Sequence, residues 1–184
     1  VTPMFREADV AVINLETTLT TTGVYSGYPC FASPVELAEA MGDMGIDIAL
    51  LANNHCCDKG ARGIDITIEQ LNRHDIFHTG AFADVDDYDK HNILYFNSKG
   101  VRFALVNYTY GTNGMPVPRG KYVNIIDNER IKRDISTINR DSVDCVIACM
   151  HWGIEYQRYP NAEQKSLVDM LRTLGVDIII GSHP

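Results

Sequence analysis

Short apolar runs that alternate with helical patterns are the feature of this sequence that most restricts its fold. The apolar runs cover residues 9–14, 47–52, 92–97, 101–107, 144–150 and 177–181. Most of them are continuously apolar, as expected of strands that are covered on both faces of a sheet. Their alternation with helices indicates the α/β class. We expect a single domain over residues 1–184, because this length suits one domain of ordinary size.

Capping residues predict where two of the helices begin and end. Ser33 is expected as the N-cap of a helix that Gly45 terminates. Asn161 and Gln164 form the pattern of a capping box, and Gly175 terminates that second helix. Weaker helical patterns cover residues 61–73 and 127–139, the acidic segment 82–91 is expected to be solvated, and the glycines and prolines within 108–122 predict a loop.

Charge and cysteine content exclude several classes of function. The formal net charge is -8, so binding of nucleic acid or of an anionic membrane through charge alone is not expected. An anionic substrate could still bind if metal ions supplied positive charge. The five cysteines include no CxxC pair, which argues against a disulfide framework or a zinc knuckle. No run approaches the ~20 apolar residues of a transmembrane helix.

Four of the apolar runs begin near an aspartate and finish on polar side chains. In open α/β sheets, ligands bind at the carboxyl ends of the strands, so parallel strands would bring these side chains to one rim. Three histidines with a carboxylate and an amide oxygen suit Mn, Fe, Zn or similar divalent ions. The polar residues at these strand ends are Asn14, Glu16, Asn53, Asn54, His55, His151, Glu155, Ser182 and His183.

Simpler interpretations apply to each of these residues taken alone. A single histidine at a strand end is usually a capping or surface residue, and only the shared placement of three favours a site. The leading aspartates (Asp9, Asp47, Asp144 and Asp177) are expected to be strand-entry residues, and the remaining histidines (His74, His78 and His91) structural. The glycine-rich loop 111–120 does not join a strand to a helix, so a phosphate-binding loop is rejected.

Four motifs resemble the CapA family of bacterial capsule (poly-γ-glutamate) synthesis proteins. They are NLE at 14–16, LANNH at 51–55, HWGIEYQRYPNAEQ at 151–164 and GVDIIIGSHP at 175–184. This family is similar to a branch of the calcineurin-like metallophosphoesterase superfamily. The resemblance implies a two-sheet sandwich flanked by helices (α/β/β/α) with a dinuclear metal centre at the strand ends. An N-terminal aspartate motif and a last histidine would lie outside residues 1–184, so the domain is expected to be incomplete at both ends.

The resemblance also implies roles for individual residues. Asn54, His151 and His183 correspond to metal ligands, and Glu16 is expected as the carboxylate ligand. His55 corresponds to the histidine that serves as an acid or stabilises the transition state. Two divalent ions (Mn, Fe or Zn) are expected as cofactors. Asn14, Asn53 and Glu155 are expected to contact the metal ligands or the substrate.

Several functions are compatible with this resemblance. The first is a capsule biosynthesis protein with a phosphoesterase-type hydrolase site, located in the cell envelope or outside the cell. Its partners would be an anionic polymer or phosphoester substrate and the capsule synthesis machinery. One alternative is a non-catalytic accessory protein that binds the polymer. Another is a metal-dependent hydrolase of a γ-linked amide polymer.

Overall fold

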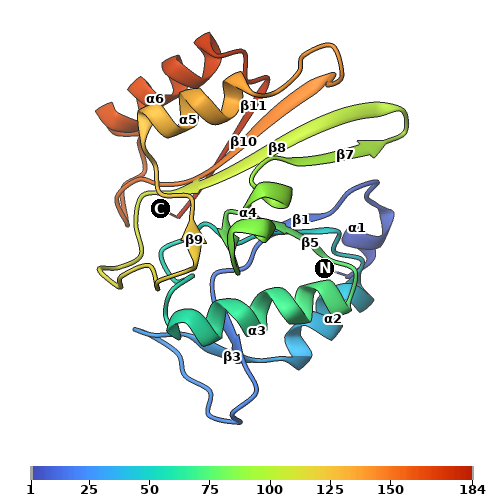
Figure 1. The fold of residues 1–184 in the computed structure, drawn as a ribbon, viewed down its shortest axis with the longest axis vertical. Coiled ribbons are helices and arrows are strands. Elements are labelled where there is room, and N and C mark those ends of the chain that lie inside the picture. Colours follow the sequence, from blue (N-terminus) through green and yellow to red (C-terminus); the bar gives the residue numbers. More distant parts are fainter. Residues whose placement is uncertain (1, 184) are drawn as a thin grey trace.

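Two β-sheets face each other between two layers of helices, which confirms the expected α/β/β/α sandwich (Figure 1). The computed structural model describes residues 2–183. The first sheet has the strand order β1-β4-β5 and the second has the order β11-β10-β8-β7. Helices α2 and α3 lie outside the first sheet, and α5 and α6 lie outside the second (Figure 1).

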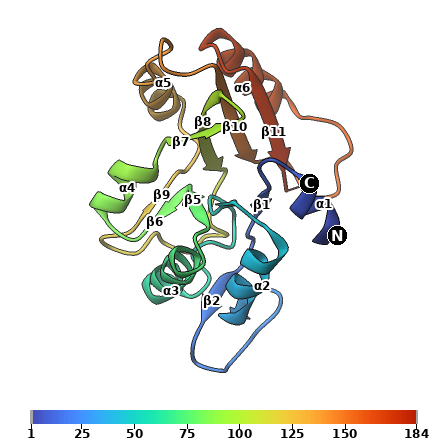
Figure 2. The same ribbon diagram turned by 90° about the vertical axis from the view of Figure 1, so that its right-hand side faces the viewer.

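The N-terminal half forms the first sheet and its helices. All strands of this sheet are parallel. A small parallel pair, β2 and β3, extends beside it (Figure 2). The elements are α1 (Thr2–Glu7), β1 (Val12–Asn14), β2 (Thr18–Thr20), β3 (Ala32–Pro34), α2 (Glu36–Met44), β4 (Ile48–Leu50), α3 (Gly60–Arg73) and β5 (Phe77–Thr79).

The C-terminal half forms the second sheet. Strands β8, β10 and β11 are parallel, and β7 is antiparallel to β8. A short antiparallel pair, β6 and β9, and the helix α4 connect the two halves. The elements are β6 (Ala81–Phe82), α4 (Val85–His91), β7 (Leu94–Ser98), β8 (Val101–Thr109), β9 (Tyr122–Val123), α5 (Asn128–Ser136), β10 (Cys145–His151), α6 (Ala162–Thr173) and β11 (Ile178–Ser182).

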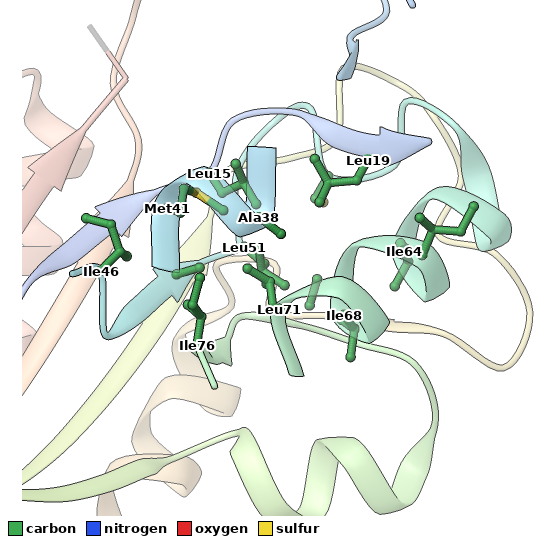
Figure 3. Packing of buried hydrophobic residues seen from close by; sticks show 14 of the residues in the cluster. Leu15, Leu19, Ala38, Met41, Ile46, Leu51, Ile64, Ile68, Leu71 and Ile76 are labelled. Carbon is green, nitrogen blue, oxygen red and sulfur yellow. The ribbon is translucent and has the colours of Figure 1, made fainter. Parts of the chain in front are cut away.

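Alternating side chains of the strands fill three apolar layers. Leu50, Leu105 and Cys149 pack between the two sheets. Ala104 and Val106, on the other face of β8, pack toward α5 and α6, as the period of two in a strand requires. The third layer lies between the first sheet and its helices, where residues such as Met41, Leu51 and Leu71 interlock (Figure 3).

A buried asparagine joins the two sheets by hydrogen bonds. Asn107 of β8 accepts a hydrogen bond from the backbone N–H of Ala52 at 2.7 Å. Its amide nitrogen donates to the carbonyl of Cys149 at 3.1 Å. Because buried polar groups are costly unless they are paired, these bonds fix how the sheets align near their carboxyl ends.

The predicted helix ends are confirmed in most cases. Gly45 ends α2 with φ of 87°, and Asn161 and Gln164 form the capping box of α6. The N-cap at Ser33 is wrong, because this residue lies in β3 and its hydroxyl pairs with Thr17 at 3.0 Å. The helix begins after Val35 instead, without a side-chain cap.

The acidic segment 82–91, expected to be solvated, contains the helix α4, none of whose residues is buried. The helix itself was not predicted from the sequence. Its N-cap is Asp84, whose carboxylate accepts from the N–H of Asp87 at 2.9 Å. Acidic residues in the first turn stabilise the helix, because their negative charge lies at the positive end of the helix dipole. His78, expected on a helix end or loop, lies in strand β5. All five cysteines are free, as expected. Among residues 2–183, no helix is long and apolar enough to cross a membrane.

Candidate metal centre

The carboxyl ends of strands from both sheets bring Glu16, His151 and His183 together. One ligand atom of each lies within 4.8 Å of the others. Glu16 follows β1, His151 ends β10 and His183 follows β11. The parallel pairing of β10 with β11 aligns His151 with Ser182, so the two histidines leave the sheet side by side. We call these three residues and Asn54 the strand-end site.

His151 is held in one orientation by contacts at both ring nitrogens. Its Nδ1 lies 3.1 Å from the hydroxyl of Ser182. Its Nε2 lies 2.9 Å from Oδ1 of Asn54 and 3.7 Å from Oε1 of Glu16. Burial, followed by the nearby His183 and His55, lowers the pKa of His151 to about 4. The ring is therefore neutral near pH 7, which is the form that binds metal ions.

His183 completes an aromatic corner of the site. Its ring centre lies 4.8 Å from that of His151 and 4.9 Å from that of Tyr110. Its φ of 105° turns the chain away from the end of β11. Its Nε2 lies 4.0 Å from Oε1 of Glu155. Glu155 is thus a neighbour of His183 and lies outside the group formed with Glu16.

A chain of amides orients Glu16. Asn14 donates to Oε2 of Glu16 at 2.9 Å. Asn53, which is fully buried, donates to Oδ1 of Asn14 at 3.2 Å and to the carbonyl of Leu15 at 2.9 Å. Because Oε2 is held in this way, Oε1 is the oxygen that faces His151. Such outer contacts on a ligating carboxylate are typical of metal sites.

His55 lies beside the strand-end site with its two nitrogens in different surroundings. Its Nδ1 lies 2.8 Å from a carboxylate oxygen of Asp58, and the same oxygen accepts from the N–H of Phe31 at 2.6 Å. This pairing favours the tautomer with the proton on Nδ1. Its Nε2 lies 3.4 Å from the amide nitrogen of Asn113. One face of the ring is covered by Phe31, whose centre is 4.3 Å away.

Two contributors to this region were not predicted from the sequence. Asp58 was assigned no role from the sequence, yet it anchors His55. Asn113 comes from the loop 108–122, to which no site residue had been assigned. Its Oδ1 accepts from the amide of Asn54 at 3.3 Å and from the hydroxyl of Tyr110 at 3.3 Å. An Asn-Gly pair at 113–114 signals a turn, but nothing in the sequence shows which way the turn points.

A pocket opens beside the strand-end site. It has a volume of about 250 Å³ and lies between the chain after β10 and the end of β11. Its lining includes one cation and exposed aromatic surface. The lining residues include Trp152, Ile154, Arg158, Tyr159 and Ser182.

The donor set fits a divalent metal ion. It combines two imidazole nitrogens, one carboxylate and one amide oxygen, a combination that suits Mn, Fe or Zn better than Ca or Mg. The outer contacts of Ser182, Asn14 and Asn53 hold these donors as they are held in established metal sites. The described residues thus could hold at least one ion at this place.

Comparisons with known proteins point to one family. Residues 1–184 match the family described as bacterial capsule synthesis protein PGA_cap. A capsule biosynthesis protein CapA from Bacillus anthracis is 30% identical over 154 residues, which cover 81% of this chain and 37% of that protein. A PGA biosynthesis protein CapA from Bacillus subtilis (strain 168) is 27% identical over all of this chain and 49% of its own length. The chain therefore spans less than half of either relative.

Two solved structures share the fold at low sequence identity. A protein from Staphylococcus aureus, provisionally named a 5'-nucleotidase, superimposes with a TM-score of 0.55 at 16% identity and covers 79% of this chain and 30% of its own. The sulfate thiohydrolase SoxB of Thermus thermophilus gives a TM-score of 0.53 at 14% identity, covering 80% of this chain and 26% of its own. These likenesses confirm the metallophosphoesterase-type fold.

Proposed function

The chain belongs to the bacterial capsule synthesis protein family PGA_cap, and from that premise we propose that it is a metal-dependent hydrolase. Its substrate would be a phosphoester or a related bond in an anionic compound of capsule formation. The supporting observation is the strand-end site, where Nε2 of His151 lies 2.9 Å from Asn54 and 3.7 Å from Glu16. We propose Glu16, Asn54, His151 and His183 as metal ligands.

The bound metal would supply electrostatic stabilisation of negative charge and a lowered pKa for water. The residues of the chain would position the metal ligands and the substrate. The amides of Asn14 and Asn53 would keep Glu16 pointed at the site. Arg158, in the adjacent pocket, would bind an anionic group of the substrate that is remote from the reacting bond.

His55 would donate a proton to the leaving group. Asp58 holds its Nδ1, so Nε2 is the nitrogen available on the side of Asn113. Once protonated, Nε2 would donate to the leaving oxygen as that oxygen becomes charged. Asp58 would stabilise the imidazolium formed in this step, as a carboxylate partner of a histidine does.

The first test is metal content. After incubation with Mn²⁺, Zn²⁺ or Fe²⁺ and removal of free ions, elemental analysis should find metal in the wild type and less in His151→Ala, because that variant lacks a ligand. His74→Ala is the matched control and should keep the wild-type content. About two ions per chain at this site would support a dinuclear centre. No ion lost in His151→Ala would contradict the proposal and favour a polymer-binding accessory protein.

The second test separates catalysis from metal binding. His55→Ala should lower kcat by roughly 10²- to 10⁴-fold, the usual contribution of general acid catalysis, while its metal content stays near that of the wild type. Turnover should be measured on phosphomonoesters, phosphodiesters and γ-linked glutamyl amides. The amides are included because a relative is described as a PGA biosynthesis protein. Full turnover in His55→Ala would remove this residue from the mechanism.

A further inference from the structure

A second cluster of two histidines and a carboxylate lies apart from the strand-end site. His78 comes from β5, while Asp87 and His91 come from α4. One ligand atom of each lies within 4.8 Å of the others. In Figure 2, α4 is at the left edge of the molecule, and β11, the strand that precedes His183, is on the right. The two clusters therefore share no residue and no strand end.

The two histidines contact the same carboxylate oxygen of Asp87. Nε2 of His78 lies 3.1 Å from Oδ1 of Asp87, and Nδ1 of His91 lies 2.6 Å from the same oxygen. Asp87 and His91 are four residues apart, so they lie on one face of α4. The two rings are 4.7 Å apart between centres. The ligand atoms of all three residues are therefore close enough together for one ion to contact them.

The carboxylate is fixed before any ligand arrives. The N–H of Ala83 donates to Oδ2 of Asp87 at 2.7 Å, which leaves Oδ1 toward the histidines. Burial alone would raise the pKa of Asp87, but hydrogen bonds from His78, Ala83 and His91 lower it to about 2. The group is therefore ionised near pH 7, as a metal ligand must be.

Burial gives the cluster a closed side and an open side. The side chain of His78 is 1% exposed, whereas that of His91 is 26% exposed. An ion could enter past His91, and water could complete its coordination. Nδ1 of His78 has no hydrogen-bond partner among the described residues, so only packing and the contact of Nε2 with Asp87 orient this ring. We expect weaker binding than at a site whose histidines all have outer partners.

We propose that His78, Asp87 and His91 bind one divalent transition-metal ion, with Zn²⁺ as the best match to two imidazoles and one carboxylate. We call this the α4 site. The ion would link β5 to α4 across the twelve residues between His78 and His91, which include β6 and the start of α4. The α4 site would exist whether or not the strand-end site binds metal.

The test is a Zn²⁺ titration by calorimetry, combined with elemental analysis, on wild type, His91→Ala, Asp87→Asn and His151→Ala. His91→Ala should bind one ion fewer than the wild type, since it removes a partly exposed ligand. Asp87→Asn should weaken this binding by more than the roughly 10- to 100-fold typical of an outer-shell change. His74→Ala is the control and should match the wild type. Circular dichroism should show that each variant is folded.

The outcomes separate the two sites. An ion that survives in His151→Ala and is lost in His91→Ala supports the α4 site, even if the strand-end site binds nothing. Wild-type stoichiometry and affinity in both His91→Ala and Asp87→Asn would overturn the α4 site and leave the strand-end site untouched. In that case the cluster is a set of hydrogen bonds that fastens α4 to the sheet.

Discussion

The segments β1–α2–β4 and β10–α6–β11 are built alike. In each, a helix ends at a glycine, an aspartate follows, and the last strand then pairs parallel with the first strand of the segment. Asp47 accepts from the N–H of Ala11 at 2.7 Å, and Asp177 accepts from the N–H of Val146 at 2.8 Å. In return, the N–H of Asp47 donates to the carbonyl of Ala11 at 3.0 Å, and the N–H of Asp177 donates to the carbonyl of Val146 at 2.9 Å.

The two segments differ in what covers their last strand. In β4 every residue is buried, because β1 and β5 flank it and the second sheet lies over it. In β11, at the edge of its sheet, Ile178 is 43% and Ile180 is 51% exposed. The hydrogen bonds of Asp47 and Asp177 are therefore set by the local sequence, whereas the burial of β4 and β11 is set by the strands and the sheet that lie next to them. Both strands still deliver polar residues to one rim.

The largest expected effect tests whether the two helices contribute equally. Met41 of α2 and Leu171 of α6 occupy matching places, since their carbonyls accept from Ile46 and Val176 at 3.1 and 3.0 Å. Both side chains are buried. Met41→Ala and Leu171→Ala should each lower the free energy of unfolding by about 2–5 kcal/mol, through lost apolar burial and a cavity. Urea unfolding measures this change.

Ile180→Ala is the control for these two variants. Its side chain lies on the exposed edge strand, so the expected change is within about 0.5 kcal/mol, as for most surface substitutions. A loss at Ile180 as large as that at Leu171 would mean that the edge of β11 is covered in solution. The contrast in burial between β4 and β11 would then be lost.

An intermediate effect is expected from the paired aspartates. Asp47→Ala and Asp177→Ala each remove a charged acceptor from a backbone N–H of a buried residue. Each should cost about 1.5 kcal/mol of unfolding free energy, the lower range for hydrogen bonds to charged groups. Thermal and urea unfolding of the two variants should agree. A loss at only one aspartate would show that the shared hydrogen bonds do not carry the same weight in the two segments.

Much of the fold could be predicted because its signals are local. Continuous apolar runs predicted six of the strands, the glycines predicted where α2 and α6 end, and the capping box predicted where α6 begins. The rule that parallel strands end at one edge predicted that Glu16, His151 and His183 would meet. Their roles as ligands, and that of His55 as an acid, stay predictions.

The rest depends on contacts that a local pattern does not contain. Asn113 reaches His55 from a loop whose course is set by tertiary packing, with φ of 52° at that residue. The helix α4 was missed because its acidic composition is also typical of solvated chain. Once α4 is known to be helical, the spacing of Asp87 and His91 is a readable signal. The contribution of His78 still requires the pairing of β5 with β4.

The smallest expected effect concerns how the two segments begin. Asp144, before β10, binds the guanidinium of Arg102 at 2.7 and 2.9 Å and accepts from its N–H at 2.9 Å. These contacts lower the pKa of Asp144 to about 2. Asp9, before β1, makes a single exposed ion pair with Lys99 at 2.8 Å. An exposed single pair of this kind contributes little to stability.

The two aspartates should therefore differ in acid. The unfolded pKa of an aspartate is about 3.9, so the stability that Asp144 contributes is full above that pH and is lost as the pH falls toward 2. In urea unfolding measured from pH 5 to pH 2, Asp144→Asn should lose part of the wild-type acid dependence, and more at low than at high salt concentration. Asp9→Asn should keep it. Equal acid curves for wild type and Asp144→Asn would mean that Arg102 holds this edge no more firmly than Lys99 holds the other.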